Sequence, residues 1–206
     1  MRRKEILVTG EIYHIFSRSI ANYRIFNNDY EFNRMLQLIK YYQRENDLKF
    51  SSFIESRLVQ EEGFNNGLEI ILSNKDKLVE IIAYCFMPTH IHLIIKQAQN
   101  NGISDYMRKI LNSYSCYFNT KHERKGPLWE SKFKNVLVDS DEQLLHLTRY
   151  VHLNPVTASM INNPYDWPFS SYKEYLMEDN NIICRFKDIL EIEPSIYRKF
   201  VNDQIS

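Results

Sequence analysis

Two apolar segments on either side of a short turn constrain the fold of this chain more than any other feature. Residues 78–86 and 91–96 are rich in β-branched and aromatic side chains, and residues 87–90 between them read Met-Pro-Thr-His. This pattern predicts two strands that form a hairpin or lie close together. Strands of this composition need a covering layer, so we expect helices from the rest of the chain to pack on them.

The remaining segments alternate between helical and strand periodicity. The pattern predicts strands over residues 11–17 and 133–138, and helices over residues 29–44, 103–122 and 141–153. We expect the last helix to end at Asn154, because Pro155 disfavours helical geometry in the residue before it. Helices that interleave with strands around a central hairpin predict an α+β fold, with helices packed on an antiparallel sheet.

Residues 45–78 are less regular than their surroundings and contain Gly63 and the run Asn65-Asn66-Gly67. We interpret them as a variable insertion that contains some helix. The predicted organisation is one domain over residues 1–176, including this insertion, followed by a C-terminal helical extension over residues 177–206.

Composition excludes several classes of protein. The chain of 206 residues carries 26 basic and 26 acidic side chains, so its net charge gives no general argument for a nucleic-acid partner. No stretch approaches the roughly twenty apolar residues of a membrane span, and residues 1–5 lack the apolar run of a signal peptide. Cys85, Cys116 and Cys184 are scattered, which favours neither a disulfide framework nor a zinc site. We therefore expect a cytoplasmic protein with no membrane partner.

Positive charge is concentrated between Arg108 and Lys134. This stretch holds seven lysines and arginines against Glu123 and Glu130, with Trp129 among them. A basic segment with an aromatic residue is compatible with a groove that binds a nucleic-acid strand, and a solvated charged face is an equal alternative.

His90 and His92 stand at the start of the second hairpin strand. Side chains two positions apart on a strand point to the same side, so the two imidazoles can converge on one metal ion. The pair supplies half of a metal site, and two partly buried histidines without a metal are the alternative. The other ligands must come from elsewhere in the chain.

Tyr150 and Asn154 are four residues apart in the last predicted helix and therefore project from one face. The amide oxygen of Asn154 suits Mg²⁺ or Mn²⁺ and would complete a site with two histidines. Tyr150 would then stand beside a metal that can polarise a phosphodiester, which is what a tyrosine nucleophile needs. His152 and Arg149 are candidates to help the phenol lose its proton. A packing role for Tyr150 and a helix-ending role for Asn154 are the alternatives.

Four segments, in order, resemble a known family. They are residues 83–95 (AYCFMPTHIHLII), 126–134 (GPLWESKFK), 149–156 (RYVHLNPV) and 167–172 (WPFSSY). From about Gly10 to Tyr175 the chain resembles the single-tyrosine HUH transposases of insertion-sequence type, and among them the REP-associated tyrosine transposases.

The resemblance implies a ferredoxin-like antiparallel sheet with the two histidines on a central strand and the tyrosine on a helix that lies across it. Matched position by position, His90 and His92 correspond to the paired metal ligands, Tyr150 to the nucleophile and Asn154 to the amide ligand. The implied activity is DNA transposition. Single-stranded or hairpin DNA of REP-type palindromes would be cleaved and rejoined through a covalent 5′-phosphotyrosine, with Mg²⁺ or Mn²⁺ as cofactor. Whether such an enzyme works as a monomer or a homodimer is left open.

Contacts with DNA are expected from basic and aromatic residues near these motifs. The candidates are Arg18, Arg124, Lys125, Trp129, Lys132, Lys134 and Arg149. Basic side chains would bind phosphates, whereas Trp129 would either stack on a base or anchor its loop in the core.

Three alternatives remain at this stage. Tyr114 and Tyr117 are rival nucleophiles, but Phe118 follows Tyr114 where an amide or acid is needed, so we expect both to pack in the core or stack on bases. A transposase descendant that binds DNA hairpins without cutting them would have no chemical need for all four site residues. A metal-dependent hydrolase that activates water would need a carboxylate near the histidines, and none lies within residues 81–96 of the predicted hairpin.

Overall fold

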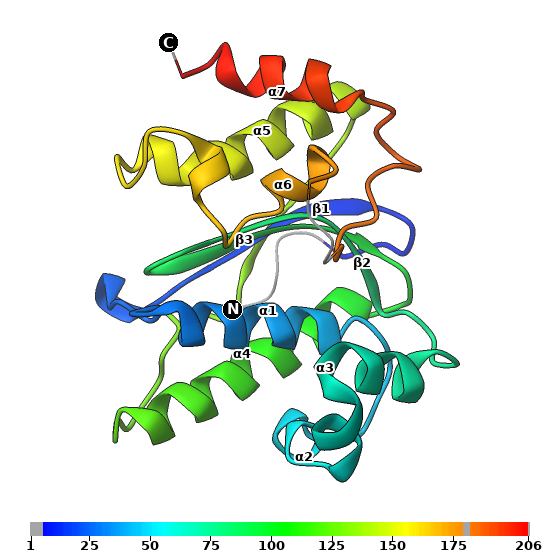
Figure 1. The fold of residues 1–206 in the computed structure, drawn as a ribbon, viewed down its shortest axis with the longest axis vertical. Helices are drawn as coiled ribbons and strands as arrows, with labels where there is room; N and C mark the ends of the chain where they lie inside the picture. The colour runs from blue at the N-terminus through cyan, green and yellow to red at the C-terminus, as the bar shows by residue number, and fades with distance from the viewer. Residues whose placement is uncertain (1–5, 179–181, 206) are drawn as a thin grey trace.

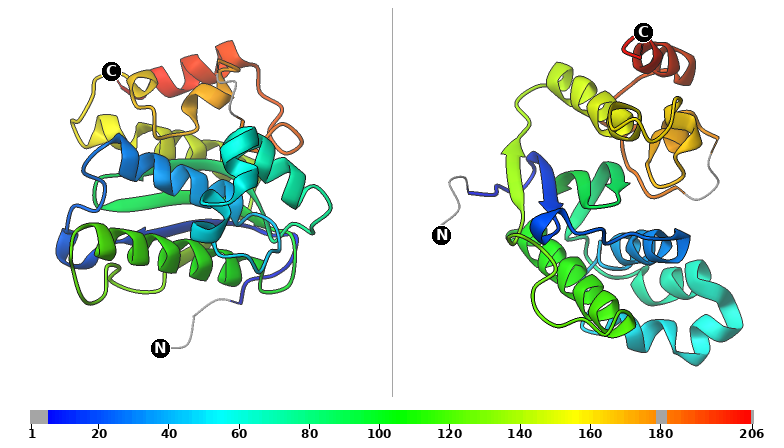
Figure 2. Two further views of the ribbon diagram at one scale, coloured as in Figure 1. Left: turned by 60° about the horizontal axis from the view of Figure 1, so that its bottom comes forward. Right: turned by 90° about the vertical axis from the view of Figure 1, so that its left-hand side faces the viewer.

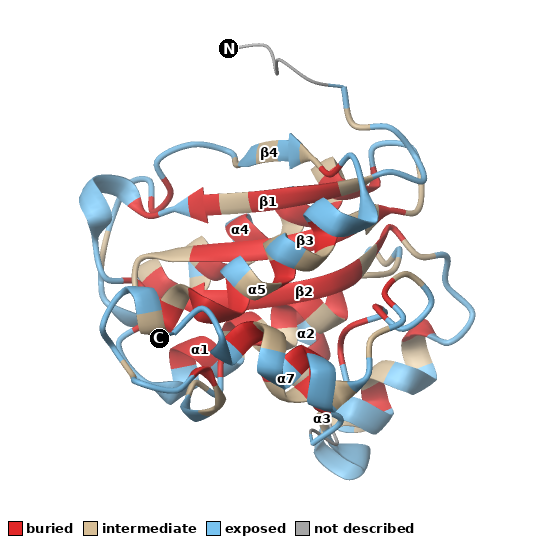
Figure 3. Ribbon diagram, turned by 90° about the horizontal axis from the view of Figure 1, so that it is seen from above, coloured by how far each residue is buried: buried red, intermediate tan, exposed pale blue. Residues whose placement is uncertain are grey.

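A four-stranded antiparallel sheet forms the centre of the molecule (Figures 1 and 3). The computed structural model describes residues 6–178 and 182–205. Residues 1–5, on which the expectation of no signal peptide depends, lie outside the described residues. The strands are β1 (Ile12–Arg18), β2 (Val79–Met87), β3 (His90–Gln97) and β4 (Lys134–Leu137). They lie in the order β2-β3-β1-β4, and the predicted hairpin strands β2 and β3 are neighbours.

Helices cover both faces of this sheet (Figure 1). One face is covered by α1 (Asp29–Tyr41) and α4 (Gly102–Lys121), and the other by α5 (Asp141–Thr157) and α6 (Tyr172–Tyr175), with α7 (Pro194–Asn202) on the outer side of α5. Two short 3₁₀ turns, Ile20–Asn22 and Pro164–Asp166, lie in the connections. The chain order β1-α1-β2-β3-α4-β4 with this strand order is the ferredoxin-like arrangement. The predicted α+β fold class is therefore confirmed.

The core lies on both sides of the hairpin strands. All of β2 except Glu80 is buried, because α1 and α4 pack below it and α5 packs above it. Continuous apolar runs in the sequence, rather than strict alternation, follow from burial on two faces. The start of α4 is pressed on the start of β2, where a Cβ at Gly102 would stand 2.1 Å from the carbonyl oxygen of Leu78. This contact requires a residue without a side chain.

The insertion is more ordered than its sequence predicts. It forms α2 (Phe50–Ile54) and α3 (Arg57–Leu72), which lie on the outer side of α1 (Figure 2). Phe50, Phe53 and Phe64 pack with Tyr41 in an aromatic cluster that holds both helices against α1. The glycine at position 63 takes φ 77° inside α3, which breaks the helical periodicity that sequence patterns rely on.

Helix α5 continues beyond the point at which Pro155 was expected to end it. It runs to Thr157, and Pro155 lies inside the helix. A proline lacks only its own backbone N–H, so the carbonyl group of Val151 loses its helical donor. The last turn is still closed, because the backbone N–H of Ala158 donates to the carbonyl oxygen of Asn154 at 3.0 Å. Asn154 therefore lies within a helical turn of α5 rather than at its end.

The C-terminal segment packs back onto the sheet and α5. The backbone N–H of Arg185 donates to the carbonyl oxygen of Ile81 in β2, and Tyr197 and Val201 of α7 are fully buried. Searched over residues 6–178 and 182–205, the structure contains no helix long and apolar enough to cross a membrane.

Candidate active site

A pocket of about 420 Å³ lies where β1, β3 and β4 meet α5. Its lining residues are His14, Phe16, Ser17, Arg18, His90, His92, Glu130, Ser131, Lys134, Tyr150 and Asn154. The structure thus brings together the four residues that the sequence singled out for chemistry, although 58 residues or more separate the hairpin histidines from Tyr150.

The two histidines of β3 stand on the face of the sheet that α5 covers. His90 begins the strand, opposite Arg18 of β1, and His92 lies opposite Phe16. Their ring centroids are 5.0 Å apart. His92 is buried and His90 is half-buried, so both rings are available from the pocket side only. The strand alternation that predicted a shared side is therefore observed.

Tyr150 rises above these histidines from α5. Its side chain is 52% exposed, and its ring stands edge-on to His92 with 5.7 Å between ring centroids. One turn later, the amide nitrogen Nδ2 of Asn154 donates to the carbonyl oxygen of Tyr150 at 2.9 Å. This bond uses the amide nitrogen and leaves the amide oxygen of Asn154 for another partner.

The donor atoms fit a divalent ion held by two imidazoles and one amide oxygen. Nδ1 of His90 is paired with Oγ1 of Thr89 at 3.0 Å, and Nδ1 of His92 is paired with Nε2 of His14 at 2.9 Å. Each of these imidazoles is therefore held through Nδ1, as the rings of metal-binding histidines usually are, which leaves Nε2 for another partner. Within residues 6–178 and 182–205, no group of three His, Cys, Asp or Glu is placed to hold a metal. A metal here would thus depend on Asn154.

Burial keeps both imidazoles neutral at pH 7. It lowers the pKa of His90 to about 4, and the positive charge of Arg18 acts in the same direction. Burial also lowers the pKa of His92 to about 2, assisted by His14, His90 and Arg18. A neutral imidazole is the form that binds a metal.

His152 does not face this pocket, so its expected role as a helper of the phenol is wrong. It is fully buried, with Nδ1 2.6 Å from the hydroxyl of Tyr197 and Nε2 2.8 Å from that of Ser171. Two positions along a helix correspond to nearly opposite faces, which is why Tyr150 and His152 point apart. Burial lowers the pKa of His152 to about 3. The residue ties α5 to the C-terminal helices.

Arg149 also binds within the protein rather than in the pocket. Its guanidinium lies 4.1 Å from the ring centroid of Phe200, and it donates to the carbonyl oxygen of that residue at 3.3 Å. It also contacts Nδ1 of His146 at 3.0 Å. This arrangement places Arg149 against α7 and away from the phenol of Tyr150.

The other predicted DNA contacts fall into two groups. Arg18 and Lys134 are exposed and line the pocket, whereas Lys125 and Lys132 are exposed outside it. Arg124 folds back on its own loop, donating to the side chain of Asn119 and to the carbonyl oxygens of Gly126 and Pro127. The arginine thereby stabilises the turn after α4.

Trp129 takes the anchoring role among its two alternatives. Its ring is buried, and its indole N–H donates to the carbonyl oxygen of Leu111 in α4 at 3.1 Å. A ring in this position is not available to stack on a base. The loop that it anchors places the next two residues at the mouth of the pocket.

The rival nucleophiles lie elsewhere, as expected. Tyr114 is fully buried and donates to the carbonyl oxygen of Ile25 at 2.6 Å, and burial raises the pKa of its phenol. Tyr117 is half-buried on α4, with the guanidinium of Arg34 4.9 Å from its ring centroid. Neither lines the pocket around Tyr150.

Sequence reasoning missed two titratable residues of the site, His14 and Glu130. His14 lies on β1, on the same face as Phe16, and the alternation in residues 11–17 was the available signal. Glu130 reaches the mouth because its backbone N–H donates to the carbonyl oxygen of Arg18 at 2.9 Å. A carboxylate therefore does line the pocket, contrary to the expectation drawn from the hairpin alone.

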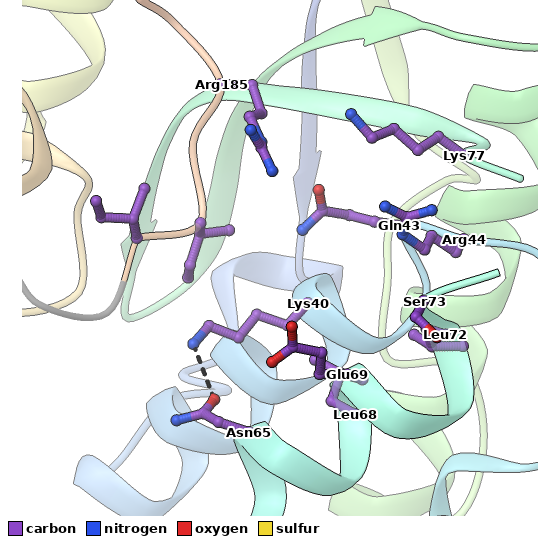
Figure 4. A pocket seen from close by; sticks show the side chains of 12 residues that line it. Lys40, Gln43, Arg44, Asn65, Leu68, Glu69, Leu72, Ser73, Lys77 and Arg185 are labelled. Atoms are coloured by element: carbon purple, nitrogen blue, oxygen red, sulfur yellow. Dashed lines mark hydrogen bonds between the residues drawn. The ribbon is translucent and has the colours of Figure 1, made fainter. Parts of the chain in front are cut away.

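A second pocket, of about 690 Å³, lies between α1, α3 and the C-terminal segment (Figure 4). Lys40, Arg44, Lys77 and Arg185 contribute to it, and Arg185 points into it from the side opposite α1. Lys77 is paired with Glu80, and Arg44 donates to the carbonyl oxygen of Lys75. Its described lining contains no histidine or tyrosine, so the chemistry is concentrated in the smaller pocket.

Comparisons with known proteins identify similar chains. Residues 59–154 match a protein-family model described as "Transposase IS200 like", a range that includes His90, His92, Tyr150 and Asn154. A "Putative REP-associated tyrosine transposase" of Haemophilus influenzae is 26% identical over 103 residues, covering 45% of this chain and 58% of that protein. A "REP-associated tyrosine transposase" of Escherichia coli K12 is 25% identical over 104 residues, covering 50% of this chain and 60% of that protein. The matches thus span about 60% of the length of these curated relatives.

A solved structure supports the fold over nearly the whole chain. It is described as "Structure of the REP associates tyrosine transposase bound to a REP hairpin" and has a TM-score of 0.57 at 15% identity. The match covers 93% of this chain and 94% of that one. At this identity the likeness shows the fold. Together, the three comparisons confirm the resemblance to REP-associated tyrosine transposases that the four sequence segments indicated.

Proposed function

We propose, from this confirmed resemblance and the geometry of the pocket, that the protein cleaves and rejoins single-stranded or hairpin DNA through a covalent bond to Tyr150. One observation carries the proposal. The phenol of Tyr150 is half-exposed and stands edge-on to His92, in the pocket that also holds His90 and Asn154. This is the arrangement that a nucleophile beside a metal site requires.

The mouth of the pocket suits an anionic strand. Arg18 and Lys134 line it against the carboxylate of Glu130, and the neutral imidazoles add no charge of their own. Phosphate oxygens of a DNA strand would bind these two cations and orient the strand without reading its sequence. A net charge of zero for the whole chain makes this local excess more informative.

His90, His92 and Asn154 would hold Mg²⁺ or Mn²⁺ through two ring nitrogens and one amide oxygen. A bound divalent ion supplies Lewis-acid polarisation of the scissile phosphodiester. The protein contributes the fixed positions of the ligands, since both rings are held by hydrogen bonds at Nδ1 and Asn154 is held by the backbone of α5.

The proposed step exchanges one phosphate ester bond for another. The phenol oxygen of Tyr150 attacks phosphorus and loses its proton, the bond from phosphorus to the 3′ oxygen breaks, and that oxygen leaves as a 3′-hydroxyl. The 5′ end remains attached to Tyr150 as a phosphotyrosine. Attack by a 3′-hydroxyl on this linkage reverses the exchange and rejoins strands, which is the chemistry of DNA transposition.

The substrate proposed is a hairpin of REP-type palindromes with an unpaired flank. Support comes from the names of the similar proteins and from the REP hairpin in the similar solved structure. Within the chain, the half-exposed Tyr150 opens on a pocket of about 420 Å³, in which an unpaired flank would place its phosphate. We propose either a monomer or a homodimer as the acting species.

A labelled hairpin tests the proposal. The protein is incubated with Mn²⁺ and a hairpin oligonucleotide labelled at its 3′ end, and the products are separated under denaturing conditions. We expect the label to move with the protein, whereas a 5′ label leaves on a shorter fragment with a 3′-hydroxyl. Tyr150→Phe should form no adduct and still bind the hairpin. The matched control is Tyr30→Phe, because Tyr30 is 81% exposed on α1 and far from the pocket lining.

Glu130 supports a second candidate function. An exposed carboxylate at the pocket could activate water for metal-dependent hydrolysis. That enzyme would cut the hairpin without an adduct and would retain activity in Tyr150→Phe. A protein that only binds hairpins would give neither an adduct nor cleavage. The same gel therefore separates all three functions.

A further inference from the structure

The imidazole of His14 is the immediate neighbour of the imidazole of His92. Nε2 of His14 lies 2.9 Å from Nδ1 of His92, and the rings are stacked with 5.1 Å between centroids. Phe16 lies directly opposite His92 in the β1–β3 register, so His14 reaches it diagonally from two residues away. Both histidines are buried, so this contact is shielded from solvent.

Two neutral imidazoles joined in this way share a single proton along the contact. If His92 carries a hydrogen on Nδ1, it donates to Nε2 of His14, and its own Nε2 is an acceptor. If His14 is the donor, Nδ1 of His92 is the acceptor and the hydrogen of His92 is on Nε2. Only the first arrangement leaves His92 ready to bind a cation through Nε2.

The partner of His90 does not impose the same choice. Oγ1 of Thr89 lies 3.0 Å from Nδ1 of His90, and a hydroxyl can rotate to donate or accept. His14 is a ring fixed in a strand with neighbours on both sides, β3 and β4. The two proposed ligands are therefore oriented by different groups, and only at His92 is the tautomer of the ligand tied to that of a second ring.

We propose that His14 is a positioning residue that fixes the tautomer and orientation of His92, so that Nε2 of His92 is the atom offered to a metal. The metal-binding role of this arrangement rests on the proposed function, whereas the tautomer of His92 is a property of the metal-free protein. His14 also contacts Tyr150, with 6.1 Å between ring centroids, so its ring helps to support the nucleophile from below.

The test must separate the hydrogen bond from this packing. His14→Phe keeps an aromatic ring of similar shape and removes the acceptor. His14→Gln removes the ring and keeps an oxygen that can accept from Nδ1 of His92. The control is His146→Gln, an exposed histidine of α5 that lies outside the pocket, which reports any Mn²⁺ bound by surface imidazoles.

Two measurements are made on the folded variants. Nitrogen chemical shifts of the His92 ring, recorded by NMR without metal, should show hydrogen on Nδ1 in the unsubstituted protein and a mixture of tautomers in His14→Phe. Mn²⁺ affinity without DNA, measured by titration calorimetry, should fall about 10- to 100-fold in His14→Phe, as for other residues that orient a ligand. We expect His14→Gln to recover part of the loss and His146→Gln to cause none.

The outcomes distinguish this proposal from the proposed function. An unchanged His92 tautomer and an unchanged Mn²⁺ affinity in His14→Phe would overturn the positioning role, even if the unsubstituted protein forms the DNA adduct. The same holds if His14→Gln is as impaired as His14→Phe and both tautomers are present in the unsubstituted protein. Conversely, a Tyr150 adduct that never forms overturns the proposed function, whereas the NMR result still decides whether His14 sets the tautomer.

Discussion

Helix α5 places a tyrosine and a histidine together twice, once on each of its sides. The two pairs differ in how many of their polar atoms have hydrogen-bond partners within the protein. On the pocket side, Tyr150 of α5 stands over His92, half-exposed. On the other side, His152 of α5 is hydrogen-bonded to Tyr197 of α7, and both are fully buried. We call these the open pair and the closed pair.

The polar atoms of the closed pair are hydrogen-bonded to other groups of the protein. Both ring nitrogens of His152 are engaged, and the hydroxyl of Tyr197 also donates to Oγ1 of Thr148 at 3.1 Å. In the open pair, the hydroxyl of Tyr150 makes no hydrogen bond within residues 6–178 and 182–205. A buried network that is fully satisfied stabilises a fold, whereas an exposed phenol with no protein partner is accessible to a substrate. The same residue types therefore point to different functions on the two sides of one helix.

The largest expected effect comes from removing a histidine of the open site. His90→Ala should reduce the DNA adduct below detection, because one of the two ring ligands is lost. His90 is half-buried at the first position of β3, so unfolding free energy should change by no more than about 1 kcal/mol. Adduct formation with Mn²⁺ and urea unfolding measure the two quantities. Adduct yield near that of the unsubstituted protein would show that His90 is not a metal ligand.

The same substitution in the closed pair should have the opposite profile. His152→Ala leaves a cavity and removes one of the two hydrogen-bond partners of the Tyr197 hydroxyl, so we expect unfolding free energy to fall by about 2–4 kcal/mol. Adduct yield per folded molecule should remain. His146→Ala on the exposed side of α5 serves as the control. If His152→Ala instead abolished the adduct in folded protein, the distinction between the two pairs would fail.

A second buried cluster, on the other face of the sheet, extends the comparison, because its contribution to the unfolding free energy depends on pH. Glu31 of α1 is fully buried and binds Lys121 at 2.8 Å and His122 at 2.7 Å, both at the end of α4. Burial raises the pKa of Glu31, but hydrogen bonds from Lys121, from the backbone of Asn27 and from His122 outweigh it and lower the pKa to about 2.

The sign of the effect follows from that lowered pKa. The carboxylate contributes fully above about pH 4.5, and its contribution is lost as the pH falls toward 2. Glu31→Gln should lower the unfolding free energy by about 2 kcal/mol at pH 7 and should flatten its fall below pH 4.5. Thermal unfolding at several pH values measures both. An equal acid dependence in Glu31→Gln would show that other groups cause it.

Local periodicity explains which parts could be predicted from the sequence. His90 and His92 share a side because of strand alternation, and Tyr150 and Asn154 share a face because of helical spacing. Each pattern depends on one element, so it can be predicted without the tertiary structure. The helical rule would also have excluded His152 from the side of Tyr150, because positions two apart do not share a face. That error came from proximity in the sequence.

The missed residues depend on pairings between distant segments. His14 joins the site only because β1 lies beside β3 in a register that no local pattern specifies. Glu130 joins it because Trp129 anchors its loop on α4 and the loop then runs beside Arg18. Helix α5 is longer than predicted for a different reason, because the turn after Pro155 is closed by the backbone N–H of Ala158, which no local pattern specifies.

The smallest expected effect is on DNA affinity. It distinguishes an exposed basic side chain from one that is hydrogen-bonded within the protein. Lys134 is exposed at the pocket, whereas Arg124 donates to Asn119 of α4 and to two carbonyl oxygens of its own loop. Each phosphate contact with a single strand adds about 0.7 to the slope of log affinity against log salt concentration. In a Tyr150→Phe background, which prevents cleavage, Lys134→Ala should reduce this slope by about that amount and Arg124→Ala should leave it unchanged. Fluorescence anisotropy with a labelled hairpin measures the slope. An equal reduction in both variants would mean that Arg124 releases its loop contacts to bind DNA, and that the arrangement seen in the free protein does not predict which cations meet the strand.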